Sequence, residues 1–228
     1  PYSNGKPPVY NVSTLQLDSP SLALHLAKER KQVNRFKLRI RSYSSDPDSW
    51  IYFEVKRKEE HFIRKTRSRI QLRDYDVSLF QKPFTVPDFQ FEHGYVNQYE
   101  FLRLKDSVGA QPMMHIHYER ESWIGKDNPE IRITMDRKIR YHTADGYALL
   151  TGDEKGWRAM DGETALRRPF GGLVLEIKTS MQIPSWILKL IQYFDLQRTG
   201  FCKYSAAMRL ESLYTGQTYT AMYERCHL

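Results

Sequence analysis

Short segments in which charged and apolar residues alternate are the feature of this sequence that most limits its fold. Residues 37–41 read Lys-Leu-Arg-Ile-Arg, and a similar alternation recurs at residues 53–56, 131–134 and 175–178. Because successive side chains of a β-strand point to opposite faces of the sheet, each segment would have one apolar face and one charged face. Such strands are typical of antiparallel sheets, whereas the strands of doubly wound parallel sheets are apolar on both faces.

The remaining patterns predict an α+β fold, in which a few helices accompany mostly antiparallel strands. Ser19 and Pro20 are typical of a helix start, with serine as the N-cap and proline in the first turn. Asn97 and Glu100 have the spacing of a capping box, in which two side chains satisfy the first amides of a helix. Strands are expected at residues 9–18, 36–43, 50–58, 61–72, 113–120, 130–141 and 172–179, and helices after Pro20, over 97–107 and after Pro184.

Positive charge is concentrated in one part of the chain. The net charge is +8, and residues 28–73 hold 15 Lys or Arg against six Asp or Glu. A concentrated basic segment predicts an anionic partner such as a nucleic acid, a membrane surface or a phosphate-rich small molecule. Aromatic residues are not interleaved with this segment as they are in a base-stacking platform, so nucleic acid is not the expected partner.

The charged strand faces allow two arrangements. If the sheet closes with these faces inward, the strands would line a basic tunnel and their apolar faces would pack against helices. Like charges that face one another repel and lose hydration, so such a tunnel makes physical sense only with a polyanion or a metal ion inside. The alternative is an ordinary half-exposed sheet whose charged faces lie in water.

Cysteine and histidine content gives few signs of other chemistry. Cys202 and Cys226 are too few for a disulfide framework or a cysteine-rich zinc site, and a cytoplasmic location is expected. His115 and His117 have metal-like spacing, but without a third nitrogen or sulfur ligand nearby in the sequence, packed or exposed histidines are the better interpretation. No run of 18 apolar residues and no secretory signal peptide occur, so no membrane segment is expected.

Nearly the whole chain resembles one known family through short motifs that occur in the family's order. Five stretches are similar to its Y-x-R … R-[IV]-[ST]-x-D signature and its L-E-[IV]-K … P-x-W-[IL] … F-S-K-[YF] tail: residues 118–120, 131–136, 174–178, 184–186 and 201–205. Residues 17–20, 39–43, 53–56 and 65–67 also match in order. The family is the VTC domain, the polyphosphate polymerase branch of the triphosphate tunnel metalloenzymes. The resemblance implies an antiparallel β-barrel or tunnel with flanking helices, formed by a single domain over residues 1–228 that lacks the family's first tunnel strand.

The resemblance also implies a reaction and a set of site residues. The γ-phosphate of ATP would be transferred to a growing inorganic polyphosphate chain, with Mn²⁺ or Mg²⁺ as the cofactor. The implied catalytic residues are Arg39, Arg41, Lys56, Arg120, Arg132 and Lys203. Lys65, Tyr118, Lys178 and Cys202 would make further substrate contacts, and Glu176 would bind the metal. Cys202 stands where the family usually has serine, and a thiol is a weaker hydrogen-bond donor than a hydroxyl.

These residue types suit phosphoryl transfer, which depends on charge neutralisation and in-line positioning more than on covalent catalysis. Arginine and lysine clamps, together with one hard divalent cation, supply both. Two other functions remain open. One is a tunnel triphosphatase that hydrolyses triphosphate or nucleoside triphosphates, and the other is a non-catalytic module that binds polyphosphate.

Overall fold

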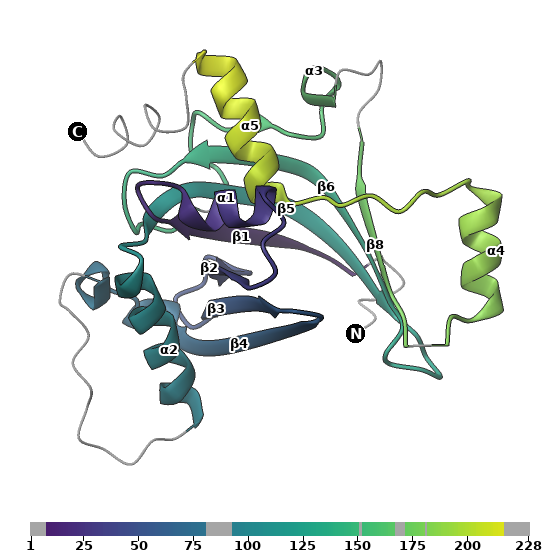
Figure 1. Ribbon diagram of the computed structural model, residues 1–228, viewed down its shortest axis with the longest axis horizontal. Coiled ribbons are helices and arrows are strands. Elements are labelled where there is room, and N and C mark those ends of the chain that lie inside the picture. Colours follow the sequence, from purple (N-terminus) through teal and green to yellow (C-terminus); the bar gives the residue numbers. More distant parts are fainter. Residues whose placement is uncertain (1–7, 81–92, 151, 167–171, 181, 217–228) are drawn as a thin grey trace.

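An eight-stranded antiparallel sheet is the centre of the fold, which is α+β as the sequence predicts (Figure 1). The computed structural model describes residues 8–80, 93–150, 152–166, 172–180 and 182–216. The strands are β1 (Val9–Asp18), β2 (Arg35–Ser42), β3 (Trp50–Glu59), β4 (Phe62–Gln71), β5 (Gln111–Ile124), β6 (Arg132–Thr143), β7 (Arg158–Ala159) and β8 (Val174–Lys178). The helices are α1 (Ala23–Glu29), α2 (His93–Ser107), α3 (Glu163–Leu166), α4 (Ser185–Tyr193) and α5 (Lys203–Thr215), with short 3-10 helices at Leu72–Asp74 and Val77–Phe80.

The sheet is open in the residues that the structure describes. Its strand order is β4-β3-β2-β1-β5-β6-β7, and β8 pairs with a different stretch of β6 from β7. Strands β4 and β8 therefore lie at opposite edges of the sheet and do not pair with each other. Closing a barrel requires hydrogen bonding between the two edges of a sheet. The expected closed tunnel is thus replaced by a curved, open trough.

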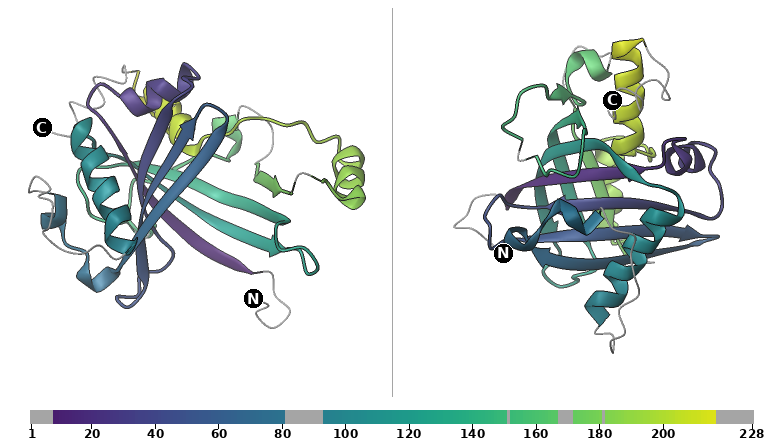
Figure 2. Two further views of the ribbon diagram at one scale, coloured as in Figure 1. Left: turned by 60° about the horizontal axis from the view of Figure 1, so that its bottom comes forward. Right: turned by 90° about the vertical axis from the view of Figure 1, so that its left-hand side faces the viewer.

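Curvature brings distant strands of the sheet together. Figure 2 shows β2, β3 and β4 at a steep angle to β5 and β6, so that one face of the sheet is concave. Lys56 of β3 lies close enough to Glu176 and Lys178 of β8 for their charges to act on it, although four strands lie between β3 and β8. The concave face therefore has charged side chains on both of its sides.

Helices cover the two faces of the sheet in different places. On the convex face, Phe53 of β3 packs edge-to-face on Phe101 of α2 with ring centroids 5.3 Å apart, within a core that includes Ile40 and Val55. On the concave face, helices α1 and α5 cover one end, where Ile116 and Met208 belong to a second apolar cluster. The polar side chains of β2, β3, β4, β6 and β8 lie on the rest of the concave face, and Figure 1 shows the backbone of these strands.

Seven of the eight strands lie close to their expected ranges, and the two-residue strand β7 was not expected. Helix α1 begins later than expected. It starts at Ala23, because Pro20 lies in a turn and Leu22 has a left-handed backbone with φ of 57°. The backbone amides of Leu24 and His25 each donate a 2.8 Å hydrogen bond to the buried carboxylate of Asp18. The Ser19 hydroxyl also accepts a 2.9 Å hydrogen bond from the backbone amide of Ala23, so the predicted serine and the Asp18 carboxylate together satisfy the first turn.

Helix α2 begins at His93, four residues before the expected start. The capping box at Asn97 and Glu100 is therefore wrong, because both residues lie inside the helix and contact β4. The side-chain amide of Asn97 donates to the carbonyl of Arg67 at 3.0 Å, and the hydroxyl of Thr66 donates to the Glu100 carboxylate at 2.8 Å. Among the helices in the described ranges, none is long and apolar enough to cross a membrane.

Candidate functional site

The site residues predicted from the sequence gather on the concave face of the sheet. Strand register places Arg39 opposite Glu54, and Glu54 opposite Arg67, on one side of the trough. On the other side, Arg132 lies opposite Lys178. We call this surface the basic face; it consists of Lys37, Arg39, Arg41, Glu54, Lys56, Lys65, Arg67, Tyr118, Arg120, Arg132, Asp136, Glu176 and Lys178, with Cys202 and Lys203 at the start of α5.

A buried carboxylate, Glu54, organises the β2–β4 side of the basic face. Its Oε2 lies 2.5 Å from Arg39 Nε and 3.7 Å from Arg41 Nη1. Its Oε1 lies 2.6 Å from Lys65 Nζ and accepts a 2.8 Å hydrogen bond from Arg67 Nε. Burial alone would raise the pKa of Glu54, but the charges of Arg39, Arg41 and Lys65 hold it well below its ordinary value. Four cations share one negative charge, so this side remains strongly positive.

A second buried carboxylate, Asp136, organises the β5–β6 side. Arg120 donates two hydrogen bonds to it, at 2.6 Å from Nε and 2.8 Å from Nη2, and Lys203 Nζ lies 2.6 Å from Oδ2. Burial would raise the pKa of Asp136, but Arg120 and Lys203 lower it. The ring of Tyr118 lies beside both cations, 4.6 Å from Lys203 Nζ and 5.3 Å from the Arg120 guanidinium carbon. Tyr118 therefore acts as a packed platform for the cations.

The start of α5 brings Cys202 to the basic face. Lys37 Nζ donates a hydrogen bond to Cys202 Sγ at 2.9 Å, although the two residues are far apart in the sequence. Burial would raise the pKa of the thiol, but the Lys37 ammonium group lowers it to about 7. At neutral pH a large share of Cys202 is therefore thiolate, an anion at the position where the family usually has a neutral hydroxyl.

The end of the trough between β3 and β8 holds the more exposed site residues. Burial, with the charges of Arg39 and Lys37, lowers the pKa of Lys56. Glu176 is 49% exposed, and its Oε1 lies 3.5 Å from Lys178 Nζ. Lys56 therefore lies close to other cations, whereas Glu176 lies beside an opposite charge on its own strand.

The surroundings of Glu176 can be compared with what a divalent cation needs. Thr134 lies opposite Glu176 in the register of β6 and β8, and its Oγ1 is buried without a hydrogen-bond partner. Within the described residues no three His, Cys, Asp or Glu side chains are grouped as ligands. A metal here would take one carboxylate from the protein and its other ligands from phosphate and water. Mg²⁺ commonly binds in this way, so the residues fit a hard cation that arrives with phosphate.

Sequence reasoning missed four residues of the basic face as site residues: Lys37, Glu54, Arg67 and Asp136. All four lie in segments whose alternation or motifs indicate the polar face of a strand. Glu54 is a single carboxylate on the charged face of residues 53–56, and Asp136 is the aspartate of the R-[IV]-[ST]-x-D motif. For Glu54 that isolation was the available signal, because a single carboxylate on a basic face is expected to bind its neighbours.

His115 and His117 lie on the opposite face of the sheet and are both buried. Burial, followed by the charge of His142, lowers the pKa of His115 to about 4. His117 Nδ1 shares a 2.8 Å hydrogen bond with the hydroxyl of Ser13. Both residues are packed histidines, one of the two outcomes that the sequence favours over a zinc site.

Comparison with known proteins identifies the family of the chain. A sequence model of the VTC domain matches residues 2–211. This range contains every residue of the basic face and all of the described strands. No curated protein matches the chain. Because the match extends over most of the sequence, the chain belongs to the VTC domain family.

Proposed function

We propose that this protein is a metal-dependent polyphosphate polymerase that transfers the γ-phosphate of ATP to a growing polyphosphate chain. Membership of the VTC domain family supports a polyphosphate-related function. The observation that carries the finer proposal is the basic face, on which strands β2 to β6, β8 and the start of α5 all contribute cations. A strip of positive charge that crosses a sheet is complementary to a linear polyanion.

In the proposed reaction, a terminal phosphate oxygen of the chain attacks the γ-phosphorus of ATP. A bond forms between this oxygen and the phosphorus, the bond from phosphorus to the β-γ bridging oxygen breaks, and ADP leaves. Cations stabilise the negative charge of the transferred phosphoryl group in the transition state. This electrostatic stabilisation contributes more to catalysis of phosphoryl transfer than covalent chemistry does.

The two buried carboxylates prepare these cations before substrate binds. Glu54 orients Arg39 and Arg41, and Asp136 orients Arg120 and Lys203. Preorganised charges lower a barrier more effectively than side chains that must reorganise during the reaction. The carboxylates are positioning residues, since they act through the cations that they hold.

Glu176 would hold Mn²⁺ or Mg²⁺, which supplies further charge neutralisation at the phosphate oxygens when bound. Thr134 Oγ1, which is buried without a partner opposite Glu176, would donate a hydrogen bond beside that carboxylate. Arg132 and Lys178, which are paired on the same two strands, would bind phosphate.

The proposed activity is tested by incubating the protein with ATP and either Mn²⁺ or Mg²⁺. We expect one ADP for each phosphate incorporated into an acid-labile polymer. Orthophosphate as the sole phosphate product would support the triphosphatase. Polyphosphate binding without turnover would support the non-catalytic module. Each of these two results would contradict the polymerase proposal.

Substitution of Glu176 by glutamine tests the proposed metal site. The amide keeps the shape of the side chain but loses the charge that a hard cation requires. We expect turnover to fall roughly 100-fold or more, as on removal of a key electrostatic group, while polyphosphate binding without metal is retained. Mn²⁺ affinity in the presence of tripolyphosphate, measured by electron paramagnetic resonance, should fall in parallel. Glu119→Gln on the opposite face is the control, and an unchanged Mn²⁺ affinity in Glu176→Gln would rule out this ligand.

A further inference from the structure

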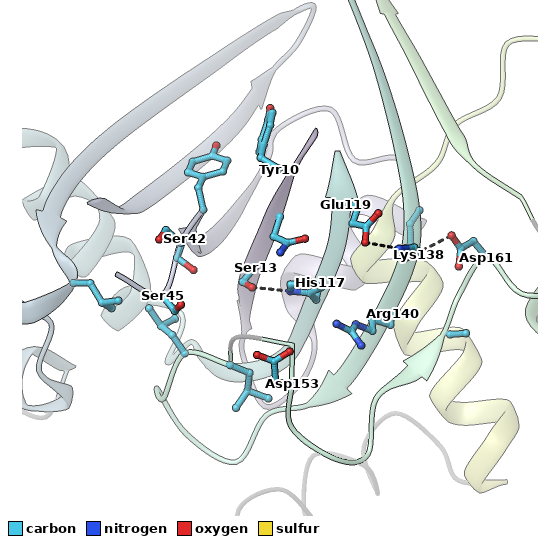
Figure 3. A pocket seen from close by; sticks show the side chains of 18 residues that line it. Tyr10, Ser13, Ser42, Ser45, His117, Glu119, Lys138, Arg140, Asp153 and Asp161 are labelled. Atoms are coloured by element: carbon cyan, nitrogen blue, oxygen red, sulfur yellow. Dashed lines mark hydrogen bonds and ion pairs between the residues drawn. The ribbon is translucent and has the colours of Figure 1, made fainter. Parts of the chain in front are cut away.

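A cavity of about 890 Å³ lies on the face of the sheet opposite the basic face. Figure 3 shows its labelled polar side chains, most of which come from β1, β2, β5 and β6. Ser45 follows β2, and Asp153 and Asp161 lie on the segments that follow β6. Leu72, Leu149 and Leu150 also line the cavity and supply apolar surface. The cavity is therefore polar on the sheet and partly apolar along its other walls.

Four polar residues on neighbouring strands form a row across the sheet beneath this cavity. Ser42 of β2 is paired with Ser13 of β1, Ser13 with His117 of β5, and His117 with Arg140 of β6. We call these four residues the outer row. Because His117 is followed by Tyr118 of the basic face, strand alternation places the outer row on the other side of the sheet. The row offers two hydroxyls, an imidazole and a guanidinium to one cavity.

Arg140, at the end of the outer row, has unused hydrogen-bonding capacity. None of the ion pairs formed by the described residues includes Arg140. Its Nε is buried without a hydrogen-bond partner, and its guanidinium carbon lies 5.4 Å from the ring centroid of Trp157. A buried donor on a charged group is costly unless it finds an acceptor. An oxyanion is the acceptor that a guanidinium binds best, through two parallel hydrogen bonds.

Three acidic residues near the row are engaged with other groups. Glu154, whose charge acts on His117, accepts hydrogen bonds from the Gly152 amide at 2.8 Å and from the Trp157 indole nitrogen at 3.3 Å. Glu119 lies 2.7 Å from Lys138 Nζ, and Asp161 accepts a 3.0 Å hydrogen bond from the backbone amide of Ile139. Asp153 is exposed to solvent, where its charge is screened. Burial and the charge of Arg140 lower the pKa of His117, so this ring is neutral at neutral pH. The positive charge that faces the row is thus concentrated at Arg140.

From these contacts we infer that the cavity is a second ligand site, which takes a small organic oxyanion. The oxyanionic group, a phosphate or a carboxylate, binds the Arg140 guanidinium, and the hydroxyls of Ser13 and Ser42 bind oxygens of the same molecule. The leucine walls accommodate its carbon skeleton. This site is separate from the basic face and does not depend on the proposed polymerase activity.

The inference can be tested with fluorine NMR on protein labelled with 5-fluorotryptophan. Trp157 lies against Arg140 and 5.8 Å from the His117 ring, while Trp50 on β3 stacks with Arg69 beside the basic face. The two indoles therefore report on the two faces. Titration with glycerol 3-phosphate, acetate and inorganic phosphate should shift the Trp157 resonance saturably with at least one probe. Tighter binding of the two phosphate probes than of acetate identifies the oxyanionic group as phosphate, and the reverse order identifies it as carboxylate.

Variants distinguish a specific site from general attraction of anions. Arg140→Gln should lower the affinity measured from the Trp157 shift at least tenfold. The double variant Ser13→Ala with Ser42→Ala should lower it several-fold. Arg137→Gln removes the same charge from β6 outside the cavity, and we expect its affinity to stay within twofold of the wild type. If Arg140→Gln does not fold, the serine double variant decides the question.

Three results would overturn the inference. The first is the absence of a saturable Trp157 shift with any probe at tens of millimolar. The second is a shift that persists unchanged in Arg140→Gln or, where that variant does not fold, in the serine double variant. The third is a response confined to Trp50, because the anions would then bind to the basic face alone.

Discussion

Replacement of Glu54 by glutamine is expected to lower the melting temperature of the ligand-free protein sharply. The amide keeps the shape of the side chain but removes the one negative charge that four cations share. Loss of one partner from a buried ion pair costs about 3–5 kcal/mol, and we expect about 3 kcal/mol because the cations are partly exposed. For a chain of this length, such a loss lowers the melting temperature by roughly 6–12 °C, which calorimetry can measure.

Added anion should restore much of this loss. Under the proposed function, tripolyphosphate binds the basic face and replaces the missing negative charge, so the melting temperature of Glu54→Gln should rise more than that of the wild type. Glu100→Gln is a matched control, because Glu100 lies 2.6 Å from Arg57 but belongs to helix α2. Its melting temperature should not respond to tripolyphosphate beyond the wild-type response. A Glu54→Gln protein as stable as the wild type would show that Glu54 does not hold the cations.

The same carboxylate determines how stability depends on acidity. The pKa of Glu54 is held below its ordinary value of 4.5, so its ion pairs contribute their full stability above that pH. The contribution is lost as the pH falls below 4.5 toward the pKa of the folded state. Asp136 has a lowered pKa as well and adds to the loss at still lower pH. The difference in stability between wild type and Glu54→Gln should therefore shrink on acidification below 4.5.

Replacement of Lys56 by methionine is expected to have opposite effects on activity and stability. In the described part of the chain, Lys56 belongs to no ion pair, and burial and two neighbouring cations lower its pKa. Removing a charge that its surroundings disfavour should leave the melting temperature of the ligand-free protein unchanged or raise it. Turnover should fall by about 100-fold, as on removal of a single preorganised donor from a site of charge stabilisation.

Steady-state ADP release and calorimetry on one preparation test both effects. Lys28→Met, which removes an exposed lysine paired with Glu29, is the control and should change neither quantity measurably. A Lys56→Met protein with full turnover would exclude this lysine from the reaction. A large drop in its melting temperature would show instead that the lysine is a structural partner.

The placement of cations on one face was predictable because strand alternation has a fixed period. Arg39 and Lys56 could be assigned to that face from their own segments alone. Their partners could not, because a partner depends on the register between strands. Glu54 meets Arg39 and Arg67 only through the pairing of β3 with β2 and β4. Arg120 meets Asp136 through a register that an irregularity after His117 shifts.

Helix α5 and the open shape of the sheet could not be predicted for different reasons. The N-cap of α5 is Cys202, which forms no capping hydrogen bond with its side chain, so the sequence carries no start signal there. Tertiary contacts fix the start of α5 instead. Lys203 forms an ion pair with Asp136, and the Tyr204 hydroxyl donates a hydrogen bond to Asp18. A sheet closes only if its two edge strands pair with each other, and the sequence of an individual strand does not show whether they do.

The open edge at β4 has a consequence for how copies of this protein meet one another. In the described residues β4 pairs with β3 alone among the strands, so its second edge forms no strand ladder, although the Arg67 carbonyl accepts a hydrogen bond from Asn97 of α2. Exposed edges of this kind promote strand addition and aggregation unless charge opposes it. Arg64, Lys65, Arg67 and Arg69 make β4 strongly cationic, and two identical edges therefore repel each other. Two of these cations, Lys65 and Arg67, belong to the basic face, so charges proposed to bind phosphate also disfavour the joining of separate molecules into a continuous sheet.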